Sequence, residues 1–199
     1  MDKSIEYYNQ KADAFFDRTI NIDMSLAYGK FLSHLSKNAK ILDAGCGVGR
    51  DAKYFKDLGY DITAFDGSIE MTRLSSNLLG QPTLHLKFQD IAFVQEFDAI
   101  WACASLLHVP YDELGTVIKR LYQAVKPQGV FYASFKYGDC QRTVEERTFY
   151  DMNEKIIQPY LGNLFSIIEF WQTPDMVSKI APSPANAWLN VLCRKRFQT

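Results

Sequence analysis

Apolar and polar positions along this chain follow two alternating periods, and the alternation predicts repeated strand and helix units. Between residues 39 and 135, short apolar runs typical of buried strands are followed by segments with apolar residues at helical spacing. We expect strands over 39–44, 60–65, 84–88, 97–102 and 130–135, and helices over 51–58, 69–79 and 112–125. This alternation predicts a parallel sheet covered by helices on both faces.

Further elements are expected on either side of this repeat. Apolar residues at helical spacing predict helices over 4–16, 26–35 and 150–161. Two strand-like runs, 165–172 and 188–196, are joined by a proline-rich link that contains Pro174, Pro182 and Pro184. We expect these two runs to form a closing pair at the edge of the sheet.

Composition narrows the class of protein. The 199 residues are 47% hydrophobic and 23% charged, which predicts a single globular domain. Within it, the two expected N-terminal helices fall in residues 1–36, and the alternating strands and helices of the core follow in 37–199. The formal net charge of −1 provides no basic field for nucleic acid or an anionic membrane, so a small-molecule partner is expected. No apolar run approaches the roughly 20 residues of a membrane span, and the N-terminus lacks a signal-like apolar core, which predicts a cytoplasmic protein.

The four cysteines are scattered without metal-ligand spacing. They predict free thiols and no metal site.

Three glycines, Gly45, Gly47 and Gly49, follow the first expected strand in the segment ILDAGCGVGRD. Glycine has no Cβ and adopts positive φ, so the backbone can turn sharply and a ligand can approach its amides closely. The turn is therefore either a cofactor-binding turn or an ordinary tight connection between a strand and a helix.

Carboxylates at the next strand ends favour the cofactor interpretation. Asp66 lies 21 positions after Gly45, where a carboxylate can accept both hydroxyls of an adenosine ribose; alternatively, it caps the following helix. Asp90 and Ile91 follow the third expected strand and could hold an adenine ring, or could belong to a loop without a ligand. A nicotinamide enzyme would favour a small residue where Arg50 stands.

The segment LDAGCGVGRD, with Asp66 ending the next strand and Asp90-Ile91 after the third, resembles the class I S-adenosylmethionine-dependent methyltransferases. The segments IWACASLLHVP and VFYASFKYG extend the resemblance to the tellurite-resistance-related branch of that family. The resemblance covers essentially the whole chain. It implies an α/β fold with a doubly wound, seven-stranded, mostly parallel Rossmann-like sheet and an antiparallel C-terminal strand.

The resemblance also implies which residues would bind S-adenosylmethionine. Gly45 and Gly47 would lie beside the methionine part of the cofactor, and Tyr8 and Met24 would close over it from the N-terminal helices. Arg50 would approach the cofactor carboxylate or form an ion pair with Asp51 or Asp43. The complete expected set is Tyr8, Met24, Gly45, Cys46, Gly47, Arg50, Asp66, Gly67, Asp90, Ile91 and Ala102.

Methyl transfer needs mainly alignment of the acceptor with the methyl group, and a base is required only when the acceptor atom carries a proton. His108 follows the fourth expected strand and is a candidate base or, alternatively, a packed or helix-capping histidine. The polar segment 135–147 contains Lys136, Arg142 and Arg147, which would suit an anionic acceptor or simply face solvent.

Methyl transfer to a small molecule is the expected activity. The alternatives are a non-catalytic S-adenosylmethionine-binding protein and a nicotinamide-dependent oxidoreductase.

Overall fold

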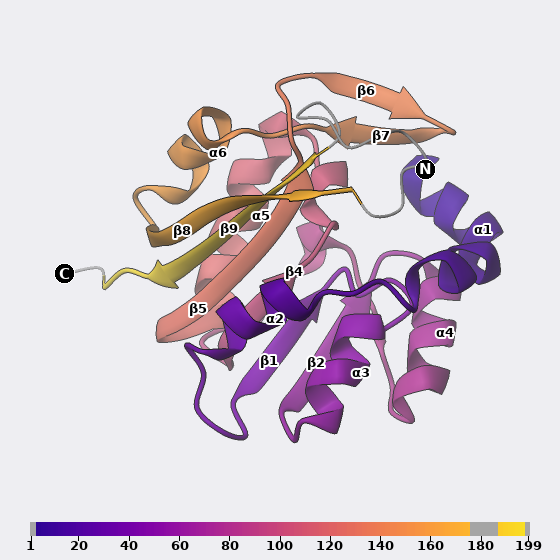
Figure 1. Ribbon diagram of the computed structural model, residues 1–199, viewed down its shortest axis with the longest axis horizontal. Coiled ribbons are helices and arrows are strands. Elements are labelled where there is room, and N and C mark those ends of the chain that lie inside the picture. The colour runs from indigo at the N-terminus through magenta and orange to yellow at the C-terminus, as the bar shows by residue number, and fades with distance from the viewer. Residues whose placement is uncertain (1–2, 176–186, 198–199) are drawn as a thin grey trace.

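The computed structural model describes residues 3–175 and 187–197. A seven-stranded sheet with the order β3-β2-β1-β4-β5-β9-β8 forms its centre, and β9 runs antiparallel to both neighbours (Figure 1). The strands are β1 Lys40–Ala44, β2 Asp61–Asp66, β3 Leu84–His85, β4 Phe97–Ala102, β5 Val125–Lys136, β8 Phe165–Pro174 and β9 Ala187–Lys195. The expected doubly wound, mostly parallel sheet with an antiparallel C-terminal strand is confirmed.

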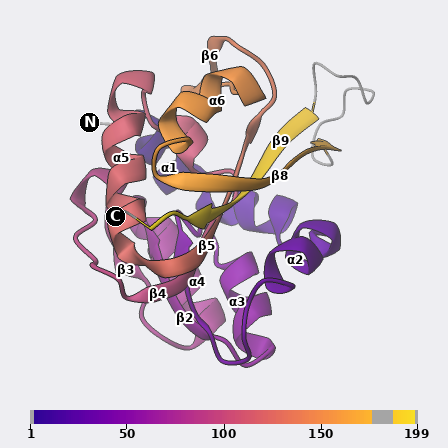
Figure 2. The ribbon, with the colours of Figure 1, turned by 90° about the vertical axis from the view of Figure 1, so that its left-hand side faces the viewer.

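Helices cover both faces of this sheet, as Figure 2 shows with α5 on one side and α2 and α3 on the other. The helices are α1 Lys3–Thr19, α2 Ser25–Leu32, α3 Arg50–Asp57, α4 Ile69–Leu79, α5 Tyr111–Ala124 and α6 Glu154–Leu161, with short 3₁₀ turns η1 Phe88–Asp90 and η2 Leu106–His108. Among the described residues, no helix combines the length and apolar character that a membrane span requires.

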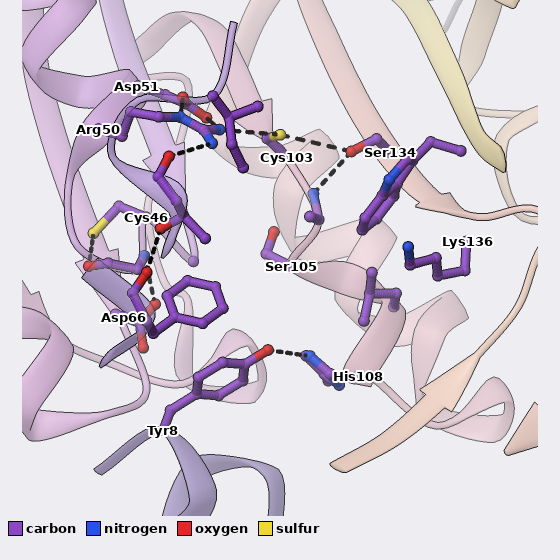
Figure 3. Close-up of a pocket in the computed structure, with 18 of the residues that line it drawn as sticks. Tyr8, Cys46, Arg50, Asp51, Asp66, Cys103, Ser105, His108, Ser134 and Lys136 are labelled. Carbon is purple, nitrogen blue, oxygen red and sulfur yellow. Dashed lines mark hydrogen bonds and ion pairs between the residues drawn. The ribbon is translucent and has the colours of Figure 1, made fainter. Parts of the chain in front are cut away.

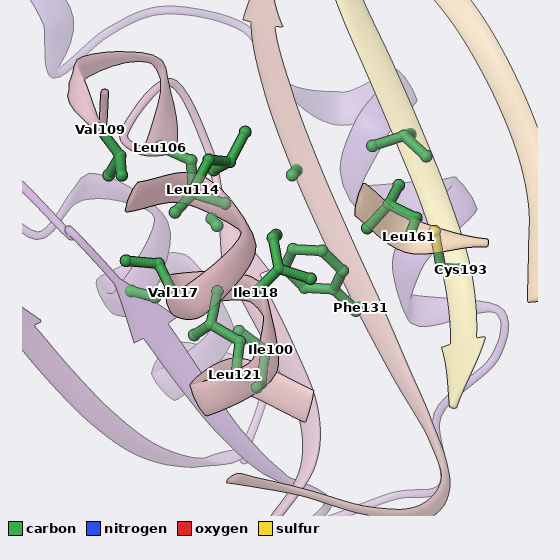
Figure 4. Close-up of a cluster of buried hydrophobic side chains, with 14 of the residues drawn as sticks. Ile100, Leu106, Val109, Leu114, Val117, Ile118, Leu121, Phe131, Leu161 and Cys193 are labelled. Atoms are coloured by element: carbon green, nitrogen blue, oxygen red, sulfur yellow. The ribbon is translucent and has the colours of Figure 1, made fainter. Parts of the chain in front are cut away.

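Alternate residues of the central strands face two separate hydrophobic cores. Ile100 and Phe131 point toward α5 and α6 (Figure 4), whereas their neighbours Trp101 and Tyr132 point toward α2 and α3. The Trp101 and Tyr132 rings stack with centroids 3.9 Å apart, and Phe31 of α2 meets Trp101 edge-on at 5.0 Å. Because α2 contributes a fully buried phenylalanine, it belongs to the packed core.

The segment after β5 differs from the expected solvated loop. Residues 141–150 form an antiparallel hairpin, β6 Gln141–Val144 and β7 Arg147–Tyr150, which lies beside α1 (Figure 1). Thr148 donates its N–H to the Ser4 hydroxyl at 3.2 Å, which ties the hairpin to the first helix. The expected helix over 150–161 begins only at Glu154, because the Asn153 side chain accepts the N–H groups of Lys155 and Ile156 and so caps it there.

Two other strands differ in length from the prediction. The third strand ends at His85, and η1 replaces the end of the expected strand over 84–88. Strand β5 begins at Val125, and a register shift against β4 between Phe97 and Ala99 accommodates the turn expected at 126–129. Pro174 ends β8, whereas Pro182 and Pro184 lie outside the described residues.

Candidate functional site

A cavity of about 1160 Å³ opens at the carboxyl ends of the central strands. Its lining comes from the turn after β1, the end of β2, the loop after β4, the end of β5, helix α1 and the β6–β7 hairpin (Figure 3). Strand order reverses beside β1, which pairs with β2 on one side and β4 on the other. This is the position where open α/β sheets bind their ligands.

The glycine turn is fastened to the end of β2. Gly45 and Cys46 both donate their N–H groups to the Phe65 carbonyl, at 3.0 and 2.9 Å. Gly47 donates its N–H to the Asp66 carboxylate at 2.8 Å. The turn and the carboxylate that the sequence singled out are thus parts of one hydrogen-bonded unit.

Asp66 combines burial with spare acceptor capacity. Its two oxygens accept N–H groups from Gly47 and Ser68, each at 2.8 Å. Burial raises the pKa of Asp66, and the two N–H donors partly offset that rise. A carboxylate has about four lone-pair sites, so both oxygens can still accept hydroxyls of a ligand.

Arg50 forms an ion pair with Asp51 at the rim of the same cavity. The guanidinium donates from Nε at 2.5 Å and from Nη2 at 3.0 Å to the two carboxylate oxygens, and Tyr28 and Trp101 donate to those oxygens as well. Burial alone would raise the pKa of Asp51, but Arg50 and these donors hold the pKa below its ordinary value. Of the two carboxylates expected as ion-pair partners for Arg50, the structure therefore selects Asp51 rather than Asp43.

One carboxylate oxygen of Asp43, Oδ2, is buried and has no hydrogen-bond partner in the part of the chain that the structure describes. Burial and the nearby charge of Asp51 raise the pKa of Asp43 well above its usual range. The residue lines the cavity at the end of β1. A positively charged ligand group there would supply the missing partner.

His108 and Tyr8 face each other across the cavity (Figure 3). His108 Nδ1 lies 2.7 Å from the Thr148 carbonyl oxygen, which can only accept, so Nδ1 carries a proton. In the neutral ring, Nε2 then accepts the Tyr8 hydroxyl at 2.9 Å. Burial raises the pKa of the Tyr8 phenol, with Arg147 partly opposing the rise, and the phenol keeps its proton at neutral pH.

Comparison with known proteins identifies a known domain within the chain. Residues 42–133 match the family model for a methyltransferase domain. Residues 42–133 are a class I, S-adenosylmethionine-dependent methyltransferase domain. The match begins in β1 and ends in β5, so it contains the glycine turn and Asp66.

Relatives of the methyltransferase domain differ in how much of this chain they cover. An uncharacterized methyltransferase of Staphylococcus carnosus is 26% identical over 183 residues, which are 82% of this chain and 88% of that protein. The malonyl-[acyl-carrier protein] O-methyltransferase of Pseudescherichia vulneris is 35% identical over 96 residues, which are 46% of this chain and 36% of that protein. The structure of 1,6-didemethyltoxoflavin-N1-methyltransferase of Burkholderia thailandensis superposes with a TM-score of 0.72 at 22% identity, covering 96% of this chain and 84% of that one. That likeness shows the fold alone.

Most site residues expected from the sequence meet in the cavity of the methyltransferase domain. The nine that line it are Tyr8, Met24, Gly45, Cys46, Gly47, Arg50, Asp66, Gly67 and His108. Asp90, Ile91 and Ala102 do not line it: Asp90 is exposed in η1, while Ile91 and Ala102 are buried in the core. Their neighbours Phe88, Gln89 and Cys103 line the cavity instead, because the third strand is shorter than expected and the fourth ends just before the lining begins.

Other lining residues of the methyltransferase domain carried no sequence signal. Ala104 has a φ of 52°, an uncommon conformation for a residue with a Cβ, and donates its N–H to the Ser134 hydroxyl. Ser105 donates its hydroxyl to the Ala44 carbonyl at 2.7 Å. These contacts join the ends of β1, β4 and β5. The residue types alone did not predict the contacts.

Replacing Gly45 with alanine is expected to lower the free energy of unfolding by about 2 kcal/mol. The φ of Gly45 is 72°, and an added Cβ would lie 2.5 Å from the Ser105 Cβ, so strain and overlap combine. Gly80, with a φ of 64° and nothing within 4 Å of the added Cβ, provides the strain-only control, and G80A should lose about 1 kcal/mol or less. Urea denaturation measures both variants. Equal losses would show that the overlap at Gly45 is relieved without cost.

Asp43→Asn should change how stability depends on pH. Because the pKa of Asp43 is raised in the folded chain, its contribution to stability is full below the unfolded pKa of about 3.9 and is lost as pH rises through the folded value. Raising the pH from about 4 to about 8 should therefore lower the free energy of unfolding of the wild type more than that of D43N. We expect the two decreases to differ by about 1–3 kcal/mol, which is the usual penalty for a buried unsatisfied polar group. Urea denaturation at both pH values tests this, with the exposed Asp61→Asn as control. Identical pH profiles for D43N and wild type would contradict it.

Proposed function

We propose that this protein transfers the methyl group of S-adenosylmethionine to a small-molecule acceptor held in the cavity. The observation that carries the proposal is the hydrogen-bonded unit of the glycine turn and Asp66 at the mouth of a cavity of about 1160 Å³. Ligand pockets commonly measure about 300–1,000 Å³, so this cavity has room for a cofactor and an acceptor together.

The residues present fit S-adenosylmethionine. Asp66 keeps acceptor capacity for the ribose hydroxyls, and the unpartnered Asp43 oxygen suits a cofactor that carries positive charge. The lining Phe88 and Gln89 would hold the adenine side in place of the expected Asp90 and Ile91. We further propose that, within residues 1–36, helix α1 and the turn before α2 act as a cap, with Tyr8 and Met24 closing the cofactor side of the cavity, while α2 itself packs in the core.

The bound cofactor supplies an activated methyl group on a positively charged sulfur, which the acceptor takes by in-line displacement. The protein's part is to hold the acceptor in line and exclude water, for which the buried turn and the aromatic lining are suited. For an acceptor that carries a proton, we propose that His108 Nε2 takes that proton when the acceptor replaces the Tyr8 hydroxyl there. Thr148 would hold the ring in the required tautomer.

The acceptor is proposed to be a small molecule in the cytoplasm. The formal net charge of −1 offers no basic field for nucleic acid, and the four cysteines are free thiols. Resemblance to the tellurite-resistance-related branch supports including tellurite among the acceptors tested.

An acceptor screen tests the proposal. The purified protein would be incubated with S-adenosylmethionine and a panel of small hydroxy, amino, thiol and carboxylate compounds together with tellurite, and S-adenosylhomocysteine formation would be followed by mass spectrometry. We expect turnover that depends on one class of acceptor. Cofactor binding without turnover on any acceptor would instead indicate the non-catalytic binding protein, and selective binding of NAD would indicate the oxidoreductase.

A further inference from the structure

The β6–β7 hairpin presents one face to the cavity. Its pairing places Arg142 opposite Phe149 and Val144 opposite Arg147, so these four side chains lie on the same side of the two strands. All four line the cavity, whereas their sequence neighbours Thr143 and Thr148 do not. The register of the hairpin therefore directs two arginines toward the ligand space.

Arg147 is the more deeply placed of these arginines. Its side chain is only 11% exposed, and its guanidinium carbon lies 4.4 Å from the Tyr7 ring centroid and 5.2 Å from that of Phe149. Planar contacts of this kind hold a guanidinium in a fixed orientation. The arginine is thus pre-positioned by aromatic rings.

Its hydrogen-bonding capacity is not used up. Within residues 3–175 and 187–197, the buried Nε atom has no hydrogen-bond partner, and Nη2 donates to the Glu145 carboxylate at 3.1 Å. Glu145 is 62% exposed on its side chain and also accepts the Tyr7 hydroxyl. A buried guanidinium N–H without an acceptor costs free energy that a ligand anion would recover.

Charge is divided across the cavity. Asp51 and Asp66 lie on one side, next to the glycine turn, and Lys136 lies on the other, beyond His108 (Figure 3). Arg142 and Arg147 belong to the hairpin that follows Lys136 in the chain. On the side left for the acceptor, each cation has a carboxylate partner: Lys136 pairs with Asp175, Arg142 with Asp151 and Arg147 with Glu145. On the side proposed for the cofactor, Asp51 pairs with Arg50, whereas Asp43 and Asp66 form no ion pair with a described residue.

We propose that the acceptor carries an anionic oxygen group, a carboxylate or a phosphate, which Arg147 binds through its guanidinium, in competition with Glu145, while Arg142, paired with Asp151, lies on the same face of the hairpin. The inference rests on the proposed function, because it assigns the acceptor side of the same cavity. Arg147 is a specificity-determining residue in this scheme, and the aromatic rings around it favour an acceptor with a flat apolar body. A fork of donors suits carboxylate and phosphate equally well.

Binding of matched probes to the protein saturated with S-adenosylhomocysteine tests this inference. The probes are benzoate, phenyl phosphate and the neutral benzamide, titrated by ligand-observed NMR. We expect at least one anion to bind about tenfold more tightly than benzamide, the effect of a hydrogen bond to a charged group. Arg147→Gln should remove that preference.

Two other variants keep the result interpretable. Glu145→Gln removes the carboxylate that competes for Arg147 and should tighten anion binding, the opposite direction from R147Q, while Arg73→Gln removes an exposed arginine outside the cavity and should change nothing. An anion affinity equal to that of benzamide, absence of anion binding, or an unchanged affinity in R147Q would overturn the inference. Failure to bind S-adenosylhomocysteine would instead overturn the proposed function. Benzoate and phenyl phosphate affinities then distinguish a carboxylate from a phosphate acceptor.

Discussion

Asp51→Ala is expected to lower the free energy of unfolding by about 3–5 kcal/mol, the range for breaking a buried ion pair by removing one partner. Asp51 is 6% exposed and accepts two donors from Arg50, the Tyr28 hydroxyl at 2.5 Å and the Trp101 indole N–H at 2.8 Å. Alanine would leave the Arg50 guanidinium buried without its carboxylate, with the Thr19 carbonyl at 3.3 Å as a remaining acceptor, and would remove the acceptor of both neutral donors. Urea denaturation followed by circular dichroism measures the loss.

Asp57 on the same helix is the matched control. Its ion pair with Lys53 has the i,i+4 spacing and is exposed on both sides, so Asp57→Ala should change stability by about 0.5 kcal/mol or less.

Because the folded pKa of Asp51 is lowered, its stabilising contribution is present above the unfolded pKa of about 3.9 and is lost as pH falls through the folded value. The difference between wild type and D51A should therefore shrink in acid. Comparable losses in D51A and D57A at neutral pH would refute the role assigned to this ion pair.

Asp66→Ala is expected to weaken S-adenosylhomocysteine binding about 100-fold, or nearly 3 kcal/mol, the effect of losing hydrogen bonds to a charged acceptor. The substitution also removes the acceptor for the Gly47 N–H, so the glycine turn loses its attachment to the end of β2. Isothermal titration calorimetry measures the affinity, and a thermal melt reports whether the variant is folded.

Asp61 begins the same strand and is exposed, far along β2 from the cavity lining, so Asp61→Ala should leave the affinity unchanged. A folded D66A variant that binds S-adenosylhomocysteine as tightly as D61A would remove Asp66 from the site.

The repeated strand and helix units could be predicted because each had a strong hydrophobic periodicity and clear sequence signals at its ends. Helix α4 and strand β4 coincide with the expected 69–79 and 97–102, and Ser68 and Gly80 are the N-cap and left-handed C-cap of α4. Apolar runs of this kind are buried on both faces here, which is the burial that their composition predicts.

The hairpin could not be predicted from the same rules. Its turn residues are Glu145 and Glu146, with φ values of 48° and 69°, where two-residue hairpins usually have asparagine and glycine. Without that signal, a polar segment such as QRTVEERTFY indicates solvent exposure. The sequence left Arg142 and Arg147 open between an anionic acceptor and solvent, and the strand register shows that both belong to the face that lines the cavity.

On the site side, residues next to the glycine turn could be predicted because the turn fixes their positions closely. The adenine side depended on where the third strand ends, and β3 has only two residues, Leu84 and His85. A short edge strand carries little periodic signal, so where the chain meets the cavity was hard to predict: Phe88 and Gln89 line the cavity, whereas adenine binding by Asp90 and Ile91 stays a prediction.

Calorimetric titration of the purified protein with S-adenosylhomocysteine, alongside NAD and NADP, tests the central claim most directly. A glycine turn bound to the half-buried Asp66 carboxylate, in the lining of a large cavity, predicts micromolar binding of S-adenosylhomocysteine and none of either nicotinamide cofactor. Selective binding of NAD or NADP, or no binding of S-adenosylhomocysteine by the folded protein, would contradict the claim that this cavity is a methyltransferase site.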